Sequence, residues 1–234
     1  WPRQNGHLML INQQLHVRQL LTADKSQALV NYELVWQAMK TFTQTRDETT
    51  VDQCWLLEHP EIFTLGRAGA EEHLLDTGSI PVLRIDRGGQ VTFHGPGQIM
   101  MYTLIDLKRR KLTVRGMVNA LEESVIQLLS QYDLPAYSDK RAPGVYIDGC
   151  KIAALGLRIS RGCSYHGLCF NYDFDSAPFE RINPCGFAEL QVTQLSEQLR
   201  HLPHKKTLVD QLVTCFSEKL AYSEITNDYS LWSG

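Results

Sequence analysis

The feature that most constrains the fold is residues 144–175, "GVYIDGCKIAALGLRISRGCSYHGLCFNYDFD", which two predicted turns divide into three runs. Asp148-Gly149 is a dipeptide typical of two-residue hairpin turns, and residues 160–162, Ser-Arg-Gly, predict a second turn. The runs around the turns are rich in apolar, β-branched and aromatic residues. The stretch is therefore predicted to form three antiparallel strands in a meander, on which helices from elsewhere in the chain would pack.

Three other segments are strand candidates, and three carry helical patterns. The strand candidates are residues 54–59, 81–89 and 97–107, and the last is apolar along nearly its whole length, as in a strand buried on both faces. Apolar residues recur at helical spacing in residues 29–39, 118–128 and 209–220. The third helix is predicted to begin near Thr207, because Asp210 three residues later completes a capping-box pattern.

Length and composition set the class of protein. The chain has 234 residues, of which 43% are hydrophobic, so one domain of the α/β class (α+β type) is predicted, with a mixed, largely antiparallel sheet and packed helices. Because the chain does not begin with Met, residues 1–16 are interpreted as an N-terminal extension, and residues 17–234 as the single functional domain.

Charge and hydropathy argue against two classes of partner. A formal net charge of −3 gives no reason to expect nucleic acid, whose partners are usually strongly basic. No apolar run reaches the roughly 18 to 20 residues that cross a bilayer, and the N-terminus lacks the pattern of a secretory signal, so no membrane partner and a cytoplasmic location are predicted. The six cysteines follow no regular spacing, so no disulfide framework is predicted.

Lys151 opens the second strand of the meander. Strict alternation places its side chain on the same face as Ala153 and Leu155, which are apolar. Desolvation on such a face disfavours the ammonium form and can make a lysine a general base. In the alternative interpretation, the stem lies on apolar surface just after the turn and the amine reaches water.

The segment 87–98, "RGGQVTFHGPGQ", contains four glycines between two strand candidates. It matches neither the phosphate-loop pattern nor G-x-G-x-x-G. Glycines let a backbone approach a ligand closely, so the segment is interpreted either as one wall of a binding site or as a structural turn. His94 within it is a candidate base or a hydrogen-bonded structural residue.

Two groups of cysteines raise questions of chemistry. Cys163, His166 and Cys169 are evenly spaced, but alternation would put the cysteines on one face and His166 on the other, and no fourth ligand is evident, so a zinc site is disfavoured. Cys185 lies between Pro184 and Gly186, in a loop that could project a thiol into a cleft. It is interpreted as a nucleophile if a base or cation lies nearby, and otherwise as a turn residue.

Taken in order, "RGGQVTFHGPGQ", residues 142–175 and "INPCG" closely resemble the lipoyl(octanoyl) transferase family, over about residues 17–199. The resemblance implies the single-domain fold of biotin and lipoate protein ligases. It also implies transfer of an octanoyl (or lipoyl) group from acyl carrier protein to a lysine of a lipoyl domain, through a cysteine thioester. By position in the motifs, the nucleophile is Cys185 and its partner is Lys151.

The same resemblance implies the remaining site residues and partners. No cofactor or metal is implied. The acceptors are lipoyl domains of 2-oxoacid dehydrogenase complexes and the glycine cleavage H protein, and the donor is octanoyl-acyl carrier protein. The family's acyl-binding segments fall on Arg87, Gly88, Gly89, Gln90, Val91, Thr92, Phe93 and His94, on Ala154, Leu155 and Gly156, and on Gly167, Leu168 and Cys169.

Two other functions remain as alternatives. An ATP-dependent lipoate or biotin protein ligase has the same fold, but it activates a free acid and needs no cysteine, so "NPCG" is the discriminating feature. A non-catalytic acyl-binding protein would have no need of both Lys151 and Cys185. The basic run 108–111, with Arg115 beyond it, is interpreted either as a docking surface for acidic carrier proteins or as a solvated face.

Overall fold

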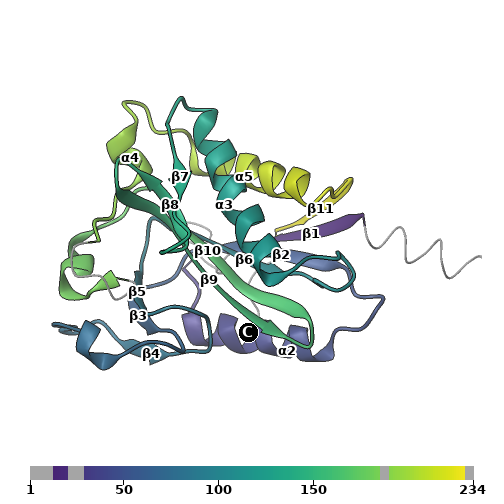
Figure 1. Ribbon diagram of the computed structural model, residues 1–234, viewed down its shortest axis with the longest axis horizontal. Helices are drawn as coiled ribbons and strands as arrows, with labels where there is room; N and C mark the ends of the chain where they lie inside the picture. Colours follow the sequence, from purple (N-terminus) through teal and green to yellow (C-terminus); the bar gives the residue numbers. More distant parts are fainter. Residues whose placement is uncertain (1–12, 21–28, 185–189, 230–234) are drawn as a thin grey trace, which may run out of the picture.

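The computed structural model describes residues 13–20, 29–184 and 190–229. Eight of their strands form one sheet in the order β11-β1-β2-β6-β10-β9-β8-β7, and a small second sheet has the order β4-β3-β5 (Figure 1). The strands of the large sheet are β1 (Gln14–Gln19), β2 (Asp52–Leu57), β6 (Gln98–Leu104), β7 (Tyr137–Ser138), β8 (Gly144–Ile147), β9 (Cys150–Ser160), β10 (Cys163–Asn171) and β11 (Glu224–Asp228). Those of the small sheet are β3 (Ile62–Leu65), β4 (Val82–Arg84) and β5 (Val91–His94).

The predicted meander is confirmed as β8, β9 and β10, paired antiparallel. Asp148 and Gly149 have φ values of 48° and 84°, and Arg161 and Gly162 have 55° and 84°. Two successive residues with positive φ are what a twisted two-residue hairpin turn requires, and glycine adopts that conformation without strain. β6 pairs with both β2 and β10 in the antiparallel sense, whereas β1 lies parallel to β2 and β11. The predicted fold class, a mixed and largely antiparallel sheet with packed helices, is therefore confirmed.

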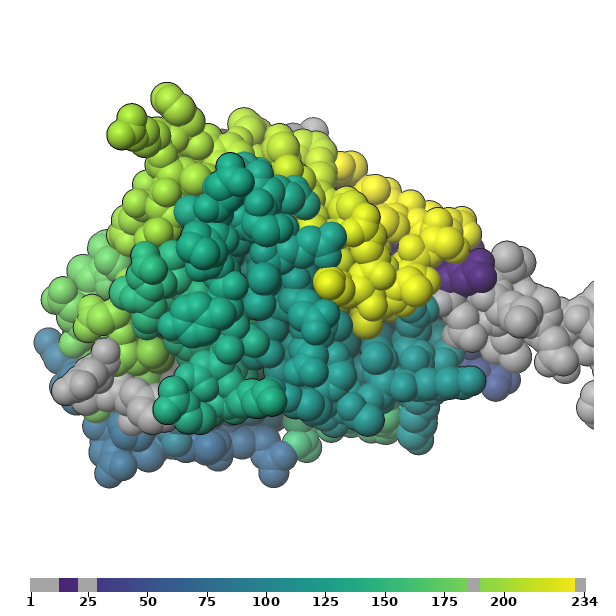
Figure 2. All heavy atoms as spheres, turned by 45° about the horizontal axis from the view of Figure 1, so that its top comes forward, coloured from purple at the N-terminus to yellow at the C-terminus, as the bar shows by residue number. Residues whose placement is uncertain are grey.

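The helices cover both faces of the large sheet. α2 (Tyr32–Thr45) packs on one face (Figure 1), and α3 (Val114–Ser130) and α5 (Lys205–Lys219) pack on the other, which faces the viewer in Figure 2. Short helical turns are η1 (Glu71–His73), η2 (Ala177–Arg181) and α4 (Leu195–Gln198). The predicted start of the third helix is wrong. Thr207 lies inside α5, and His204 caps the helix by accepting a hydrogen bond from the backbone N–H of Lys206.

The central strand β6 is buried along its whole length, as its unbroken apolar run predicted. Its alternate side chains enter two different cores. Ile99 and Met101 belong to the core beneath α3 and α5, whereas Met100 and Tyr102 belong to the core beneath α2. Of the other two strand candidates, residues 54–59 lie two residues too far along the chain, because β2 spans Asp52–Leu57, and residues 81–89 are too long, because β4 spans only three residues.

A β-bulge in β9 overturns the predicted orientation of Lys151. The register between β8 and β9 shifts between Val145 and Tyr146, so that Lys151 pairs with Tyr146 and Ala153 pairs with Val145. Ile152 is the extra residue, and both Ile152 and Ala153 enter the core beneath α3. The bulge breaks strict alternation. Lys151 therefore does not share a face with Ala153, and it lines a cavity together with Ala154.

The basic run 108–111 is partly structural. Arg109 donates from Nη2 to Asp52 Oδ1 at 2.7 Å, and Arg46 donates to the same oxygen at 2.7 Å. The hydroxyl of Tyr222 donates to the second oxygen, Oδ2, at 2.8 Å. The side chain of Asp52 is fully buried and that of Arg109 is 8% exposed. Arg109 is thus part of an internal ion cluster, and the interpretation of the whole run as a solvated or docking surface is wrong at this residue.

Candidate active site

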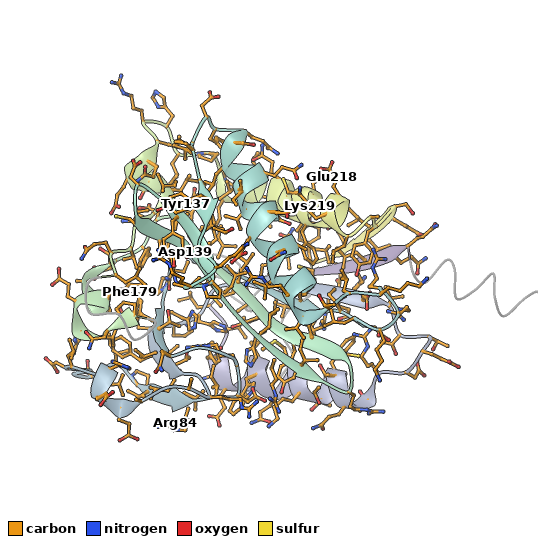
Figure 3. All side chains as sticks on the ribbon, viewed as in Figure 1. Arg84, Tyr137, Asp139, Phe179, Glu218 and Lys219 are labelled. Atoms are coloured by element: carbon orange, nitrogen blue, oxygen red, sulfur yellow. The ribbon has the colours of Figure 1, made fainter. Side chains whose placement is uncertain are left out.

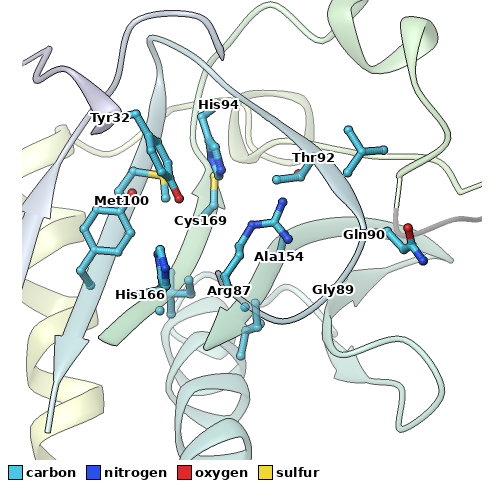
Figure 4. Close-up of a pocket in the computed structure, with 16 residues that line it drawn as sticks. Tyr32, Arg87, Gly89, Gln90, Thr92, His94, Met100, Ala154, His166 and Cys169 are labelled. Carbon is cyan, nitrogen blue, oxygen red and sulfur yellow. The ribbon is translucent and has the colours of Figure 1, made fainter. Parts of the chain in front are cut away.

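A cavity of about 50 Å³ lies beside β5, β6, β9 and β10 on the side of the sheet that α2 covers (Figure 4). Its walls are mainly apolar. Most of the residues that the sequence predicted for acyl binding line it: Arg87, Gly89, Gln90, Val91, Thr92, His94, Ala154, Leu155, Gly156, Gly167, Leu168 and Cys169. Three segments distant in sequence are thus brought together around one space, as the motifs require.

Two of the predicted acyl-binding residues lie outside this cavity. Phe93 packs in the core of the small sheet, with its ring centroid 5.6 Å from that of Phe63 and 5.8 Å from that of Phe179. Alternation along β5 explains this, because Thr92 and His94 face the cavity and Phe93 faces away. Gly88 donates its backbone N–H to Leu157 O at 2.9 Å, which ties the glycine segment to β9.

Two glycines allow the walls to approach each other. A Cβ atom built on Gly167 would lie 2.0 Å from the carbonyl oxygen of Met101 on the neighbouring strand. One built on Gly156 would lie 3.0 Å from Cδ of Arg87, so the arginine stem packs directly on the backbone of β9. Any side chain at Gly167 would force β10 away from β6 and reshape the cavity floor.

Four residues that line the cavity were not predicted as site residues: Tyr32, Met100, Tyr102 and His166. Tyr32 was identified only as part of a helical stripe. Met100 and Tyr102 were identified only as parts of a buried strand, although their spacing of two places them on one face. His166 was assigned to the face opposite Cys169, which is wrong. Its φ of 59° breaks the strand geometry, and both side chains line the cavity (Figure 4).

The histidines around the cavity are held neutral by burial. His59 shares a hydrogen bond of 2.7 Å between Nε2 and the hydroxyl of Tyr102, and burial lowers the pKa of His59 to about 4. Burial also lowers the pKa of His94 well below its usual value, and the nearby His59 and Arg87 add to this effect. The ring of Tyr32 stacks on that of His94, with 5.3 Å between the ring centroids, and burial raises the pKa of the Tyr32 hydroxyl to about 12. At neutral pH these groups carry no charge into the cavity.

Arg87 and Asp86 are the charged groups at its edge, and both are hydrogen-bonded to the protein. Arg87 donates to the carbonyl and the hydroxyl of Thr64 at 2.7 and 2.8 Å. Asp86 accepts from Trp36 Nε1 at 2.7 Å, shares a bond of 3.0 Å with His166 Nε2, and accepts from a tyrosine on β10. Burial raises the pKa of Asp86, but its hydrogen bonds from His166 and the tyrosine outweigh this and lower the pKa overall. These contacts orient the cavity wall.

Lys151 lies beside this cavity and is only 3% exposed. Its ammonium group Nζ donates to the carbonyl of Pro143 at 3.3 Å and lies 5.2 Å from the ring centroid of Tyr146. Lys151 lines a second, smaller cavity. The two cavities share Thr92, Ala154 and Cys169 as lining residues. The two spaces therefore adjoin, with Lys151 at one end.

The predicted nucleophile Cys185 lies outside the described residues. Pro184, which precedes it, is buried and lines the cavity of Lys151. After residue 189 the chain returns to the same place, because the backbone N–H of Lys151 donates to Gln191 O at 2.8 Å and Thr193 N–H donates to Lys151 O at 3.0 Å. Both ends of the segment that carries Cys185 are thus anchored at this cavity.

Two other cysteines, Cys169 in the cavity wall and Cys163 near the Asp52 ion cluster, are poorly suited to nucleophilic attack. Burial raises the pKa of Cys169 to about 12, so this cavity residue stays a thiol at neutral pH. Burial also raises the pKa of Cys163.

Among the described residues, no group of three histidine, cysteine or acidic side chains is placed to hold a metal ion. In the same part of the chain, every helix is too short or too polar to cross a membrane.

The chain is similar in sequence to proteins of one known family. Residues 31–217 match the family described as the lipoyl protein ligase A/B catalytic domain. The chain is 48% identical to an octanoyltransferase of Shewanella denitrificans, over 97% of this chain and 96% of the relative. It is 47% identical to the octanoyltransferase of Shewanella frigidimarina, over 94% and 98%.

The solved structures resemble it in fold. A lipoate-protein ligase A bound with ATP superposes with a TM-score of 0.73 at 14% identity, over 93% of this chain and 90% of the other. A bi-partite lipoate protein ligase from Thermoplasma acidophilum gives 0.68 at 14% identity, over 94% and 87%. The predicted resemblance of the fold to lipoate protein ligases is thereby confirmed.

Proposed function

Because the chain belongs to the family of lipoyl protein ligase A/B catalytic domains and is an acyltransferase, we propose that it moves an octanoyl group from acyl carrier protein to a lysine of a lipoyl domain. A lipoyl group would be carried in the same way. In this proposal Cys185 carries the acyl group as a thioester, and Lys151 moves the protons. The acceptors are lipoyl domains of 2-oxoacid dehydrogenase complexes and the H protein of glycine cleavage.

The observation that carries the proposal is the position of Lys151. A buried lysine stands where a mainly apolar cavity adjoins the anchored ends of the segment that contains Cys185. The mainly apolar lining suits an unbranched acyl chain, whose thioester carbon would lie at the end where Lys151 stands. Neutral histidines and tyrosines in the wall favour an uncharged chain over a charged ligand, because a charge would lose its hydration there.

The first step forms the acyl-enzyme. The Cys185 thiolate attacks the carbonyl carbon of the octanoyl thioester, and the bond between that carbon and the carrier sulfur breaks. The Lys151 ammonium gives a proton to the departing carrier thiolate. The products are the octanoyl thioester on Cys185, the free carrier thiol and a neutral Lys151.

The second step transfers the acyl group. The ε-amine of the acceptor lysine attacks the enzyme thioester, and neutral Lys151 accepts the proton that this amine loses. The amide forms and Cys185 departs as a thiolate. The thiolate and the ammonium are thus restored for the next cycle, and no proton is gained or lost by the enzyme.

Since the donor is already an activated thioester, the reaction needs no ATP. This separates the proposal from the ligase alternative, in which a free acid must first be adenylated. The test is intact-protein mass spectrometry after mixing the enzyme with octanoyl-acyl carrier protein. One octanoyl adduct, removed by hydroxylamine and absent in Cys185→Ala, is expected. A Cys163→Ala variant serves as the matched control and should keep the adduct, because Cys163 lines neither of the two adjoining cavities.

A second reaction contains free octanoate, ATP and magnesium with an apo lipoyl domain. We expect no octanoylated domain there, and full transfer from the carrier thioester in the presence of a chelator. If free octanoate with ATP gave product at a comparable rate, the chain would act as a ligase and the proposal would be wrong.

A further inference from the structure

One peptide group, between Pro143 and Gly144, lies between two buried charged side chains. Its carbonyl oxygen accepts from Lys151 Nζ at 3.3 Å, and its N–H donates to Glu122 Oε1 at 3.1 Å. A Cβ atom on Gly144 would lie 2.9 Å from Lys151 Cε, so only glycine lets the lysine stem lie against this peptide. The lysine, the amide and the carboxylate thus form one continuous chain of hydrogen bonds.

Glu122 is unusual among the acidic residues of α3. It is 3% exposed, whereas its neighbour Glu123 is exposed and pairs with Lys219 of α5 at 3.4 Å (Figure 3 labels Lys219). Burial raises the pKa of Glu122 overall, and the hydrogen bond from Gly144 and the charges of Arg115 and Lys151 offset only part of this rise. A buried carboxylate is costly unless it is compensated, so its place beneath the lysine calls for a reason beyond packing.

We propose that Glu122 is a positioning residue that keeps Lys151 in its ammonium form through the Pro143–Gly144 peptide. The inference rests on the proposed role of Lys151 in transfer. A carboxylate that accepts from the N–H of an amide polarises the amide and makes its carbonyl a stronger acceptor, an effect of about 10–30% per bond. The negative charge also attracts the ammonium across the peptide.

The consequence for the reaction is a lysine that can act as an acid. Burial alone would favour the neutral amine, which could not protonate the departing carrier thiol. The other titratable groups that surround the pair are Arg115 and Glu123 on α3, Tyr146 on β8 and Cys169 on β10, with Cys185 beyond the described residues. The Glu122 carboxylate is linked to Lys151 by the two hydrogen bonds of the Pro143–Gly144 peptide.

The test is a titration of Lys151 by NMR, with lysine labelled with carbon-13 at the ε carbon. The resonance is assigned by its loss in Lys151→Met. Glu122→Gln keeps the acceptor for Gly144 and the shape of the side chain but removes the charge. Its Lys151 pKa should fall by about one unit, a tenfold change in the ratio of ammonium to amine, and the alkaline limb of the pH–rate profile should move by the same amount.

Two further variants separate charge from packing. Glu122→Asp keeps the charge and should hold the Lys151 titration near the wild-type value. Glu123→Gln removes a neighbouring charge from the same helix and should leave the titration unchanged. An unaltered Lys151 titration in Glu122→Gln would overturn the inference, and so would an equal fall in Glu122→Asp, since packing would then be the cause. The titration needs no substrate, so its outcome is independent of whether octanoyl transfer is found.

Discussion

The protein buries polar groups in two regions, and it treats charge differently in each. Around Asp52 the charges are kept and paired, because Arg46 and Arg109 both donate to one carboxylate oxygen at 2.7 Å. Around the cavity lined by Thr92, Ala154 and Cys169 the histidines are kept neutral, since burial lowers the pKa of His59 and of His94, while Arg87 is hydrogen-bonded to Thr64. The first arrangement joins segments that are far apart in the sequence, and the second leaves a mainly apolar space.

The difference teaches how buried polar residues can be sorted by role. An ion cluster with every carboxylate oxygen occupied has no capacity for a ligand, so it acts as a structural clamp. A set of neutral histidines and tyrosines around a cavity is compatible with an apolar guest. The two regions should therefore respond to mutation in opposite ways, one through stability and the other through transfer.

The largest effect is expected at the cavity. Lys151→Met keeps most of the stem and removes the amine, so the rate of octanoyl transfer should fall by roughly 10²- to 10⁴-fold, as on loss of a general acid or base. The melting temperature should change little. Single-turnover transfer from octanoyl-acyl carrier protein measures the rate, and thermal unfolding measures the melting temperature. A variant that transferred at the wild-type rate would remove Lys151 from the mechanism.

At the ion cluster the expected loss is in stability. Asp52→Asn leaves two buried guanidinium groups without their counter-charge, so the free energy of unfolding should fall by about 3–5 kcal/mol. Urea unfolding checks this, with Asp210→Asn on the exposed side of α5 as the control. At low temperature, the folded fraction of Asp52→Asn should still transfer octanoyl groups normally. If the folded fraction transferred octanoyl groups more slowly than the wild type, the ion cluster would act on transfer as well as on stability, and the proposed difference between the two regions would be wrong.

The sequence predicted the elements that local patterns determine. Asp148-Gly149 and Arg161-Gly162 indicated both hairpin turns because their positive φ values demand such residues. Most of the residues that line the cavity of the candidate site followed from the family motifs. The orientation of Lys151 could not be predicted, because a bulge is set by the pairing of β8 with β9 and leaves no periodic signature in β9 alone.

Long-range contacts were also beyond local patterns. Tyr222 and Asp52 are 170 residues apart, yet their side chains bond at 2.8 Å. Nothing in the run 108–111 distinguishes the buried Arg109 from the exposed Lys108 beside it. The capping-box pattern at Thr207 failed because the helix begins at Lys205, where His204 supplies the cap instead. The sequence therefore indicated which segments form the site more reliably than which way individual side chains face.

Acid should destabilise the protein through the buried His59, which is hydrogen-bonded to the cavity residue Tyr102. His59 has its pKa lowered from 6.5 to about 4 in the folded protein, so between these values the unfolded chain binds more protons. Stability is then lost as the pH falls from 6.5 towards 4, by about 3 kcal/mol in total for this one group. Urea unfolding at several pH values should show this slope, and His59→Gln should reduce it. An equal slope in the variant would contradict the assignment.

The length of the acyl chain offers a finer test of the cavity. Ala154 lines both adjoining spaces, so Ala154→Leu should obstruct the path of a long chain. Inserting methylenes into a packed site costs about 1–3 kcal/mol, which predicts a roughly 5- to 150-fold lower kcat/KM for octanoyl-acyl carrier protein. Butanoyl-acyl carrier protein should be affected less. Equal losses for both donors would mean that the acyl chain lies elsewhere.

The smallest effect concerns docking. Arg109 and Arg110 are unsuitable for charge reversal, because Arg109 belongs to the ion cluster and Arg110 lies 4.0 Å over the ring of Tyr222. Lys108 and Lys111 are exposed. Reversing both to Glu should raise the KM for the acidic carrier protein a few-fold, equivalent to about 1 kcal/mol, and weaken its salt dependence. An unchanged KM and salt slope would place docking on another face.

The pairing of β1 also bears on how the protein folds. β1 lies between β2 and β11, and Gln14 bonds to Glu224 across 210 residues, whereas the strands of the meander are joined by two tight turns. Folding is slowed by contacts of high sequence separation. During synthesis, the strands that carry Lys151 can pair long before β11 has been made. Until then, β1 has a row of unpaired N–H and C=O groups along its outer edge, which can join strands of other chains. Addition of β11 is thus a late step that covers the outer edge of β1 and leaves β11 as the edge strand of the finished sheet.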